Sequence, residues 1–139
     1  MNEPKPVDSN RLLTEREKAI NQANPLPVLA ELLMNENDFM SWVIEYAHLK
    51  RWLVQHTRPA WSAKGYRTPI QGDKGFFDLV LARLTPMGFA DIYFVELKSQ
   101  KGRLSVEQKA WLEALDKNPT VRCFVWKPSD RSEITELLE

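Results

Sequence analysis

The chain of 139 residues contains a single cysteine, Cys123, and only two histidines. One cysteine excludes an internal disulfide and any metal site built from several cysteines. No apolar run approaches the roughly 20 residues that cross a bilayer. The first 18 residues are polar and lack the apolar core of a signal peptide. We therefore expect a cytoplasmic protein that does not enter a membrane.

The sequence also lacks a net charge, because 19 Lys and Arg balance 19 Asp and Glu. This balance argues against a protein that is basic throughout. The cations are nevertheless clustered: six basic residues and one acidic residue lie between 50 and 74, and three more basic residues lie between 98 and 103. Such clustering favours a basic face that could meet nucleic acid. An ordinary solvated loop explains the first cluster equally well.

The length and the 43% hydrophobic content suit one domain with its own core. Residues 1–34 are expected to form a polar, partly helical N-terminal extension, and residues 35–139 the domain. Periodicity and breakers predict a helix over 36–50, strands over 52–57, 77–84 and 91–98, a helix over 105–115, a strand over 121–126 and a helix over 129–138. Residues 58–74 are expected to be a long polar loop. This order, αβββαβα, predicts an α/β domain with a mixed sheet flanked by helices.

Charged residues interrupt two of the predicted apolar strands. Side chains alternate along a strand, so Glu96 and Lys98 share one face. If the turn between the strands is centred on Met87, Asp78 lies opposite Glu96 and on the same face. A register shifted by one residue would separate them. The pattern thus predicts that Asp78, Glu96 and Lys98 converge.

Two opposed carboxylates in an apolar sheet are unfavourable unless their charges are neutralised. Lys98 can offset one charge, and a hard divalent cation can offset both. Oxygen ligands without Cys or His favour Mg²⁺ or Mn²⁺. Such an ion can activate water and stabilise charge on a phosphate. A purely structural salt bridge explains the same residues without any chemistry.

The helix predicted to begin at Ser105 follows a basic turn. Ser105 and Gln108 have the spacing of a capping box, which gives both residues a structural role. The free N–H groups of the helix and the cations of the turn also suit phosphate. We expect phosphate contacts from the turn and from the basic loop, which also carries Trp61 and Tyr66: Lys101, Arg103, Ser105, Arg58, Lys64 and Arg67.

One acidic residue occupies an unusual place on the first predicted helix. On a helical wheel the apolar stripe around Val43 includes Glu36, whereas Glu45 falls on the opposite face. Glu45 is therefore expected to be solvated. Glu36 suits the helix dipole as a first-turn acid, which is its simplest explanation. A functional role explains its position as well.

The segments GFFDLVL, FVELKS and KGRLSVEQKAWL, in this order, resemble the VRR-NUC domain of the PD-(D/E)XK nuclease superfamily. The segments NENDF, QHTRPAW, RTPIQGD and VWKPSD extend the resemblance to stand-alone phage and bacterial members, over about residues 35–139. An E-x-K motif alone is unspecific, but the ordered set with GRLSxEQ is highly specific. Phe77 stands where the family usually has proline, and Met40 where glutamine is common.

This resemblance implies a restriction-endonuclease-like fold and hydrolysis of DNA phosphodiester bonds that depends on Mg²⁺ or Mn²⁺. It assigns the metal and catalytic positions to Asp78, Glu96 and Lys98, with Gln108 as the helix glutamine and Glu36 as the first-helix glutamate. The Leu97 carbonyl is a further candidate metal ligand on the same strand. Small members resemble Holliday-junction resolvases, which are homodimers that act on branched DNA in a bacterial or phage-infected cell.

Two other functions are compatible with the same sequence. A non-catalytic module could keep the fold and bind DNA, since a neutral chain has weak non-specific attraction to it. A nuclease acting on single strands or RNA is the other alternative. Metal titration separates the first alternative from an enzyme, and a panel of substrates separates the second.

Overall fold

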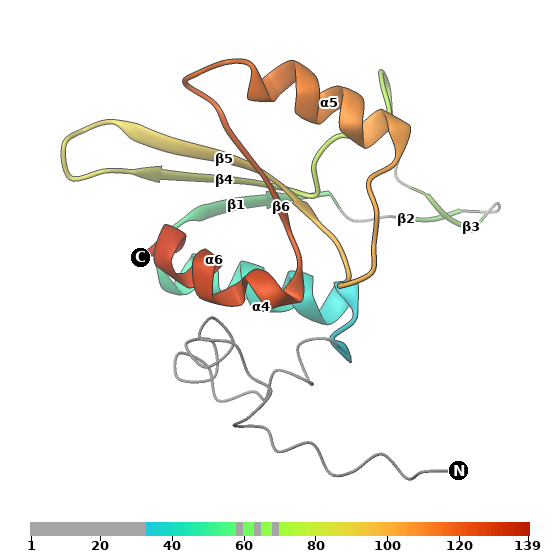
Figure 1. Cartoon of the computed structure of the whole chain (residues 1–139), viewed down its shortest axis with the longest axis horizontal. Helices are drawn as coiled ribbons and strands as arrows, with labels where there is room; N and C mark the ends of the chain where they lie inside the picture. Colours follow the sequence, from blue (N-terminus) through green and yellow to red (C-terminus); the bar gives the residue numbers. More distant parts are fainter. Residues whose placement is uncertain (1–32, 58–59, 63–64, 68–69) are drawn as a thin grey trace, which may run out of the picture.

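The computed structural model describes residues 33–57, 60–62, 65–67 and 70–139 (Figure 1). Its elements are α4 (Glu36–Leu49), β1 (Leu53–His56), β2 (Ala60–Ser62), β3 (Gly65–Arg67), β4 (Leu79–Leu84), β5 (Ala90–Leu97), α5 (Val106–Asp116), β6 (Arg122–Trp126), the short 3₁₀ helix η1 (Pro128–Asp130) and α6 (Arg131–Leu138). The predicted order of main elements is confirmed. The expected polar loop over 58–74 is wrong in one respect, because it contains the antiparallel pair β2–β3.

Four strands form a mixed sheet in the order β1-β4-β5-β6. The first three are antiparallel to one another, and β6 is parallel to β5. In the β4–β5 hairpin, Leu84 pairs with Ala90 and Leu79 with Val95, which confirms the predicted register. The return from β5 to the parallel strand β6 runs through α5, as a parallel connection requires a crossover.

The main core lies between the sheet and the helices α4 and α6, which cover one face while α5 lies on the other (Figure 1). Asn35 caps α4 by accepting a hydrogen bond from the backbone N–H of Asp38 (2.8 Å). The predicted apolar stripe of α4 is buried at Phe39, Val43 and Ala47, and Glu45 is exposed as expected. These side chains fix α4 to the sheet. No helix among the described residues is long and apolar enough to cross a membrane.

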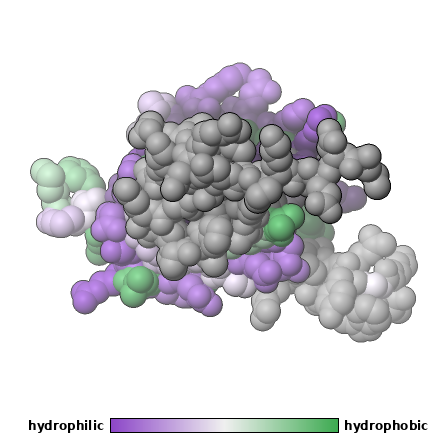
Figure 2. All heavy atoms as spheres, turned by 60° about the horizontal axis from the view of Figure 1, so that its bottom comes forward, coloured by the Kyte–Doolittle hydropathy of each residue, from purple (hydrophilic) through white to green (hydrophobic). Residues whose placement is uncertain are grey.

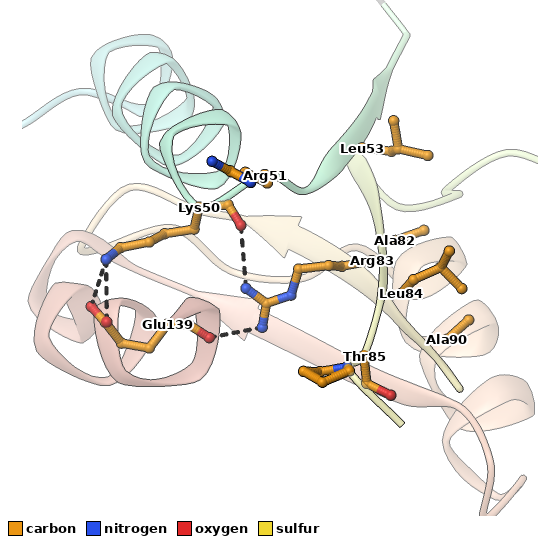
Figure 3. A pocket seen from close by; sticks show the side chains of 10 residues that line it. Lys50, Arg51, Leu53, Ala82, Arg83, Leu84, Thr85, Ala90 and Glu139 are labelled. Carbon is orange, nitrogen blue, oxygen red and sulfur yellow. Dashed lines mark hydrogen bonds and ion pairs between the residues drawn. The ribbon is translucent and has the colours of Figure 1, made fainter. Parts of the chain in front are cut away.

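Arg83 joins the ends of both core helices to the sheet (Figure 3). Its guanidinium stacks on the Trp52 ring at 4.3 Å and donates hydrogen bonds to the carbonyls of Leu138 (2.9 Å) and Lys50 (3.3 Å). These carbonyls lie at the C-terminal ends of α6 and α4, where the helices leave acceptors unpaired and favour a cation. One side chain therefore completes two helix ends.

The segment before β4 packs against α5 on the opposite face of the sheet. The Trp111 indole N–H donates to the carbonyl of Lys74 (2.9 Å), and the Phe76 and Trp111 rings meet edge to face at 5.0 Å. Gly75 has a φ of +89°, and a Cβ there would lie 2.6 Å from the backbone carbon of Glu107. Only glycine fits this conformation and this approach. The contact places the first turn of α5 beside the start of β4.

Candidate active site

Asp78 lies immediately before β4 and is held from two sides. Its carboxylate oxygen Oδ2 accepts a hydrogen bond from the backbone N–H of Leu97 (2.8 Å). The His56 ring nitrogen Nδ1 lies 3.1 Å from the backbone carbonyl of Asp78. Asp78 therefore reaches the end of β5, although regular pairing of the two strands starts one residue later. His56, the last residue of β1, anchors the backbone here.

Glu96 is the buried acid of the site, with 3% of its surface exposed. Its oxygen Oε1 lies 3.4 Å from Lys98 Nζ and accepts a hydrogen bond from Gln108 Nε2 (2.6 Å). The other end of the Gln108 amide accepts from the backbone N–H of Ser105 (2.9 Å), and Ser105 Oγ accepts from the Gln108 N–H (3.1 Å). Gln108 thus closes the capping box and binds Glu96 at the same time.

The electrostatics of the site favour a bound cation or proton. Burial and, next to it, the negative charge of Asp78 raise the pKa of Glu96 to about 8, while Lys98 opposes the change. A buried carboxylate that faces a second carboxylate is costly to ionise. In the protein alone, Glu96 therefore tends to keep its proton at neutral pH. A metal ion can take the place of that proton.

The donor atoms fit a hard cation. Asp78 and Glu96 offer carboxylate oxygens, and the neighbouring Leu97 offers a backbone carbonyl. In the part of the chain that the structure describes, no three or more His, Cys, Asp or Glu side chains gather at one point, so the protein supplies only two carboxylates here. Mg²⁺ suits such a site, since it usually takes one or two carboxylates and completes its shell with water and substrate phosphate.

Glu36 is not gathered with these two carboxylates. It is the first residue of α4 and is exposed, which fits a first-turn acid that favours the helix dipole. Glu36 lies on the apolar face of the helical wheel but is not buried, because the side chains of this face are buried only from Phe39 onward. A metal-binding role for Glu36 stays a prediction.

The predicted phosphate contacts fall into two groups. Lys101, Arg103 and Ser105 follow Lys98 directly, and all three are exposed. Arg58 and Lys64 lie outside the described residues, and only the backbone of Arg67 is described, in β3.

Sequence reasoning did not anticipate two lysines near this site. Lys109 and Lys127 line a cavity of about 370 Å³ together with Lys98 and Arg103. The parallel pairing of β5 and β6 explains Lys127, because Leu97 lies opposite Trp126 and the next residues leave the sheet at the same edge. The position of Lys127 directly after a predicted strand was a usable signal, since functional residues are often found at the carboxyl ends of parallel strands. On the other side, Thr57, Gln71, Phe76 and Asp78 help to line a cavity of about 330 Å³.

The comparison with protein families agrees with this arrangement. The model of the VRR-NUC domain matches residues 20–127, which is most of the chain and includes every residue from Asp78 to Gln108. Neither the search of curated proteins nor that of solved structures finds a match. The α/β fold, with its four-stranded mixed sheet flanked by helices, is consistent with a restriction-endonuclease-like fold. The chain therefore belongs to the VRR-NUC domain family, a family of nuclease type.

Proposed function

We propose that the protein is a DNA endonuclease that depends on Mg²⁺ or Mn²⁺ and hydrolyses phosphodiester bonds. One observation supports this most directly: Glu96 is buried beside Asp78 and contacts both Lys98 and Gln108. A fold gains little stability from a buried acid beside a second, half-buried acid, so this arrangement favours a chemical role. Residues 35–139 carry all the groups that this proposal needs.

Each residue has a defined part in the proposed reaction. Asp78 and Glu96 would hold the metal ion with the Leu97 carbonyl, and Gln108 fixes the Glu96 carboxylate through its 2.6 Å hydrogen bond. Glu36 would hold a second metal ion or a water. Lys98 orients the attacking water and stabilises charge on the phosphate oxygens. The bound ion lowers the pKa of water and neutralises developing negative charge.

We further propose that the substrate is branched DNA, such as a four-way junction, and that two copies of the chain act on it together. The described part of each chain carries one carboxylate centre, so we expect paired cuts to need a second copy. The turn of the β4–β5 hairpin offers a surface for it, because Met87 is 83% and Phe89 70% exposed. This turn extends at the left of Figure 1, and apolar atoms gather on the same side in Figure 2. It lies at the far end of the hairpin from Asp78, so contact there leaves both centres open.

The decisive experiment is cleavage of a labelled four-way junction and a linear duplex of the same sequence, with Mg²⁺, with Mn²⁺ and with neither. We expect metal-dependent cleavage of the junction by the wild type and loss of activity in Lys98→Ala. Lys117→Ala is the matched control, since Lys117 is exposed and pairs with Glu113 instead. Equal cleavage by the wild type and Lys98→Ala would refute the proposal.

Calorimetry distinguishes an enzyme from a binding module. The wild type is expected to bind Mn²⁺ with measurable heat, and Asp78→Ala is expected to lose that heat. A protein that binds the junction, gives no Mn²⁺ heat and cuts nothing would be a non-catalytic module of the same fold. Single-stranded DNA and RNA in the same cleavage panel test the remaining alternative.

A further inference from the structure

A pocket rich in cations lies next to the carboxylate centre. We call it the cationic pocket; its volume is about 370 Å³, and its lining consists of Lys98, Gly102, Arg103, Leu104, Lys109, Val125 and Lys127. No acidic residue belongs to this lining. Lys98 pairs with Glu96, but Arg103, Lys109 and Lys127 form no salt bridge with another residue that the structure describes. The lining of the pocket therefore carries an excess of positive charge.

Three separate elements bring these cations together. The strands β5 and β6 end side by side, and the Lys98 N–H donates to the Trp126 carbonyl (2.9 Å), so Lys98 and Lys127 leave the sheet at one edge. Lys109 stands on the first turn of α5, directly after Gln108, which binds Glu96. Lys109 therefore follows directly after the residue that joins α5 to the carboxylate centre.

The chain between Lys98 and α5 approaches the catalytic lysine closely. A Cβ at Gly102 would lie 3.1 Å from Lys98 Cβ and 3.2 Å from the Ser99 carbonyl oxygen. A glycine here lets the turn pass over the Lys98 stem without displacing it. The turn and the stem therefore form one continuous wall, and Lys98 belongs both to the pocket and to the carboxylate centre.

We propose that the cationic pocket binds the backbone phosphate next to the one that is cut. Clustered cations that outnumber their acidic partners repel one another and attract an anion. Two or three ammonium and guanidinium groups suit phosphate oxygens, which accept from several donors. The shared Lys98 makes the occupant of the pocket the immediate neighbour of the reacting phosphate. The identity of the polymer as DNA rests on the proposed function.

Salt-dependent binding tests this inference without any cleavage. Binding of labelled duplexes to the full chain is measured in EDTA by fluorescence anisotropy over a series of KCl concentrations. Lys109→Ala and Lys127→Ala should each weaken binding equally for unrelated sequences and lower the slope of log affinity against log salt by about 1. Lys117→Ala also removes one positive charge, but beyond the end of α5 and outside the pocket. This control should keep the wild-type slope. Wild-type slopes in both pocket variants would overturn the inference.

A neutral DNA linkage then locates the bound phosphate. Methylphosphonate replaces, one at a time, the phosphates around the mapped cleavage position. The neutral linkage next to that position should weaken binding of the wild type severalfold and have no further effect on Lys127→Ala, whereas fully additive losses would overturn the assignment. The two proposals can fail separately. If the pocket variants lower the salt slope but the wild type cuts no DNA, the phosphate pocket stands and the nuclease proposal fails. If the wild type cuts DNA but the pocket variants keep its salt slope, the nuclease proposal stands and the pocket inference fails.

Discussion

The two ends of the β4–β5 hairpin depart from the usual rule that charged side chains are exposed and large apolar side chains are buried. At one end Glu96 is 3% exposed, and at the other Met87 is 83% and Phe89 70% exposed. Charged residues are rarely buried without partners, and large apolar residues are rarely gathered at an exposed tip. Between the ends, Leu81 and Val95 are fully buried and follow the ordinary rule. Stability thus comes from the middle of the hairpin, and we expect both ends to contact something outside the chain.

Replacement of the buried acid Glu96 should have the largest effect of any change at either end of the hairpin. Glu96→Gln keeps the shape of the side chain and removes the charge. We expect the cleavage rate to fall about 100-fold or more, because a metal ligand supplies several kcal/mol of transition-state stabilisation. The free energy of unfolding should stay the same or rise, since a buried charge is costly. Single-turnover cleavage and urea unfolding of the same preparation measure both quantities.

Glu113→Gln is the matched control for that variant, because Glu113 is exposed and pairs with Lys117 on the surface. It should leave the cleavage rate unchanged. If Glu96→Gln cuts at the wild-type rate, Glu96 is a structural acid, and the carboxylate end of the hairpin has no chemical role.

The second variant removes the partner of Glu96 and leaves the acid in place. Gln108→Ala loses both the hydrogen bond to Glu96 and the bond that closes the capping box. Activity should fall about tenfold or more, as for other residues that orient a metal ligand, and the free energy of unfolding by about 1 kcal/mol. Gln108→Glu restores the cap but sets a second carboxylate against Glu96, so it should recover stability at low pH without recovering activity. Recovery of activity in Gln108→Glu would show that Gln108 acts only through the helix cap.

The raised pKa of Glu96 makes both stability and metal binding depend on pH. Its pKa rises from 4.5 to about 8 in the folded protein, mainly through burial. A carboxyl group with a raised pKa destabilises the fold as pH increases through that window, because the unfolded chain ionises first. Metal-free wild type should therefore lose stability between about pH 5 and pH 8, and Glu96→Gln should not.

Below that pKa, Mg²⁺ or Mn²⁺ must displace a proton. The apparent metal affinity should then rise about tenfold per pH unit and level off at alkaline pH. Calorimetry in two buffers with different ionisation enthalpies counts the released proton. Proton-free binding at pH 6 would contradict the assignment of Glu96 as a ligand.

Much of the carboxylate end could be predicted from the sequence, since it depends on local rules. Strand alternation and the turn around Met87 predicted the hairpin register, and the capping-box spacing predicted the bonds between Ser105 and Gln108. These signals need only the geometry of one hairpin and one helix start. The apolar stripe of α4 followed from helical periodicity in the same way.

Other features depend on elements that are distant in sequence. The wheel placed Glu36 inside the apolar stripe, yet burial of the α4 side chains begins only at Phe39, since a wheel shows the face of a helix and not where its contact with the sheet starts. Lys127 reaches the cationic pocket only because β6 pairs in parallel with β5. The contact of Arg83 with two helix ends requires knowledge of where both helices stop. Periodicity carries no information about such neighbours.

The exposed end of the hairpin gives the smallest and most specific prediction. Phe89→Lys should weaken association of two copies about tenfold, because about 1.5 kcal/mol or more is gained when a large apolar side chain leaves water. The fold should not change, since Thr85 holds the turn through bonds to the Phe89 backbone (2.7 and 3.2 Å) that do not involve the ring. Val106→Lys, also at an exposed apolar position (80%) but on α5, is the control. Sedimentation velocity over a range of concentrations measures the association, and junction cleavage should shift from paired cuts to single nicks. An unchanged mass with paired cuts would show that the second copy docks elsewhere and that the apolar turn contacts another surface.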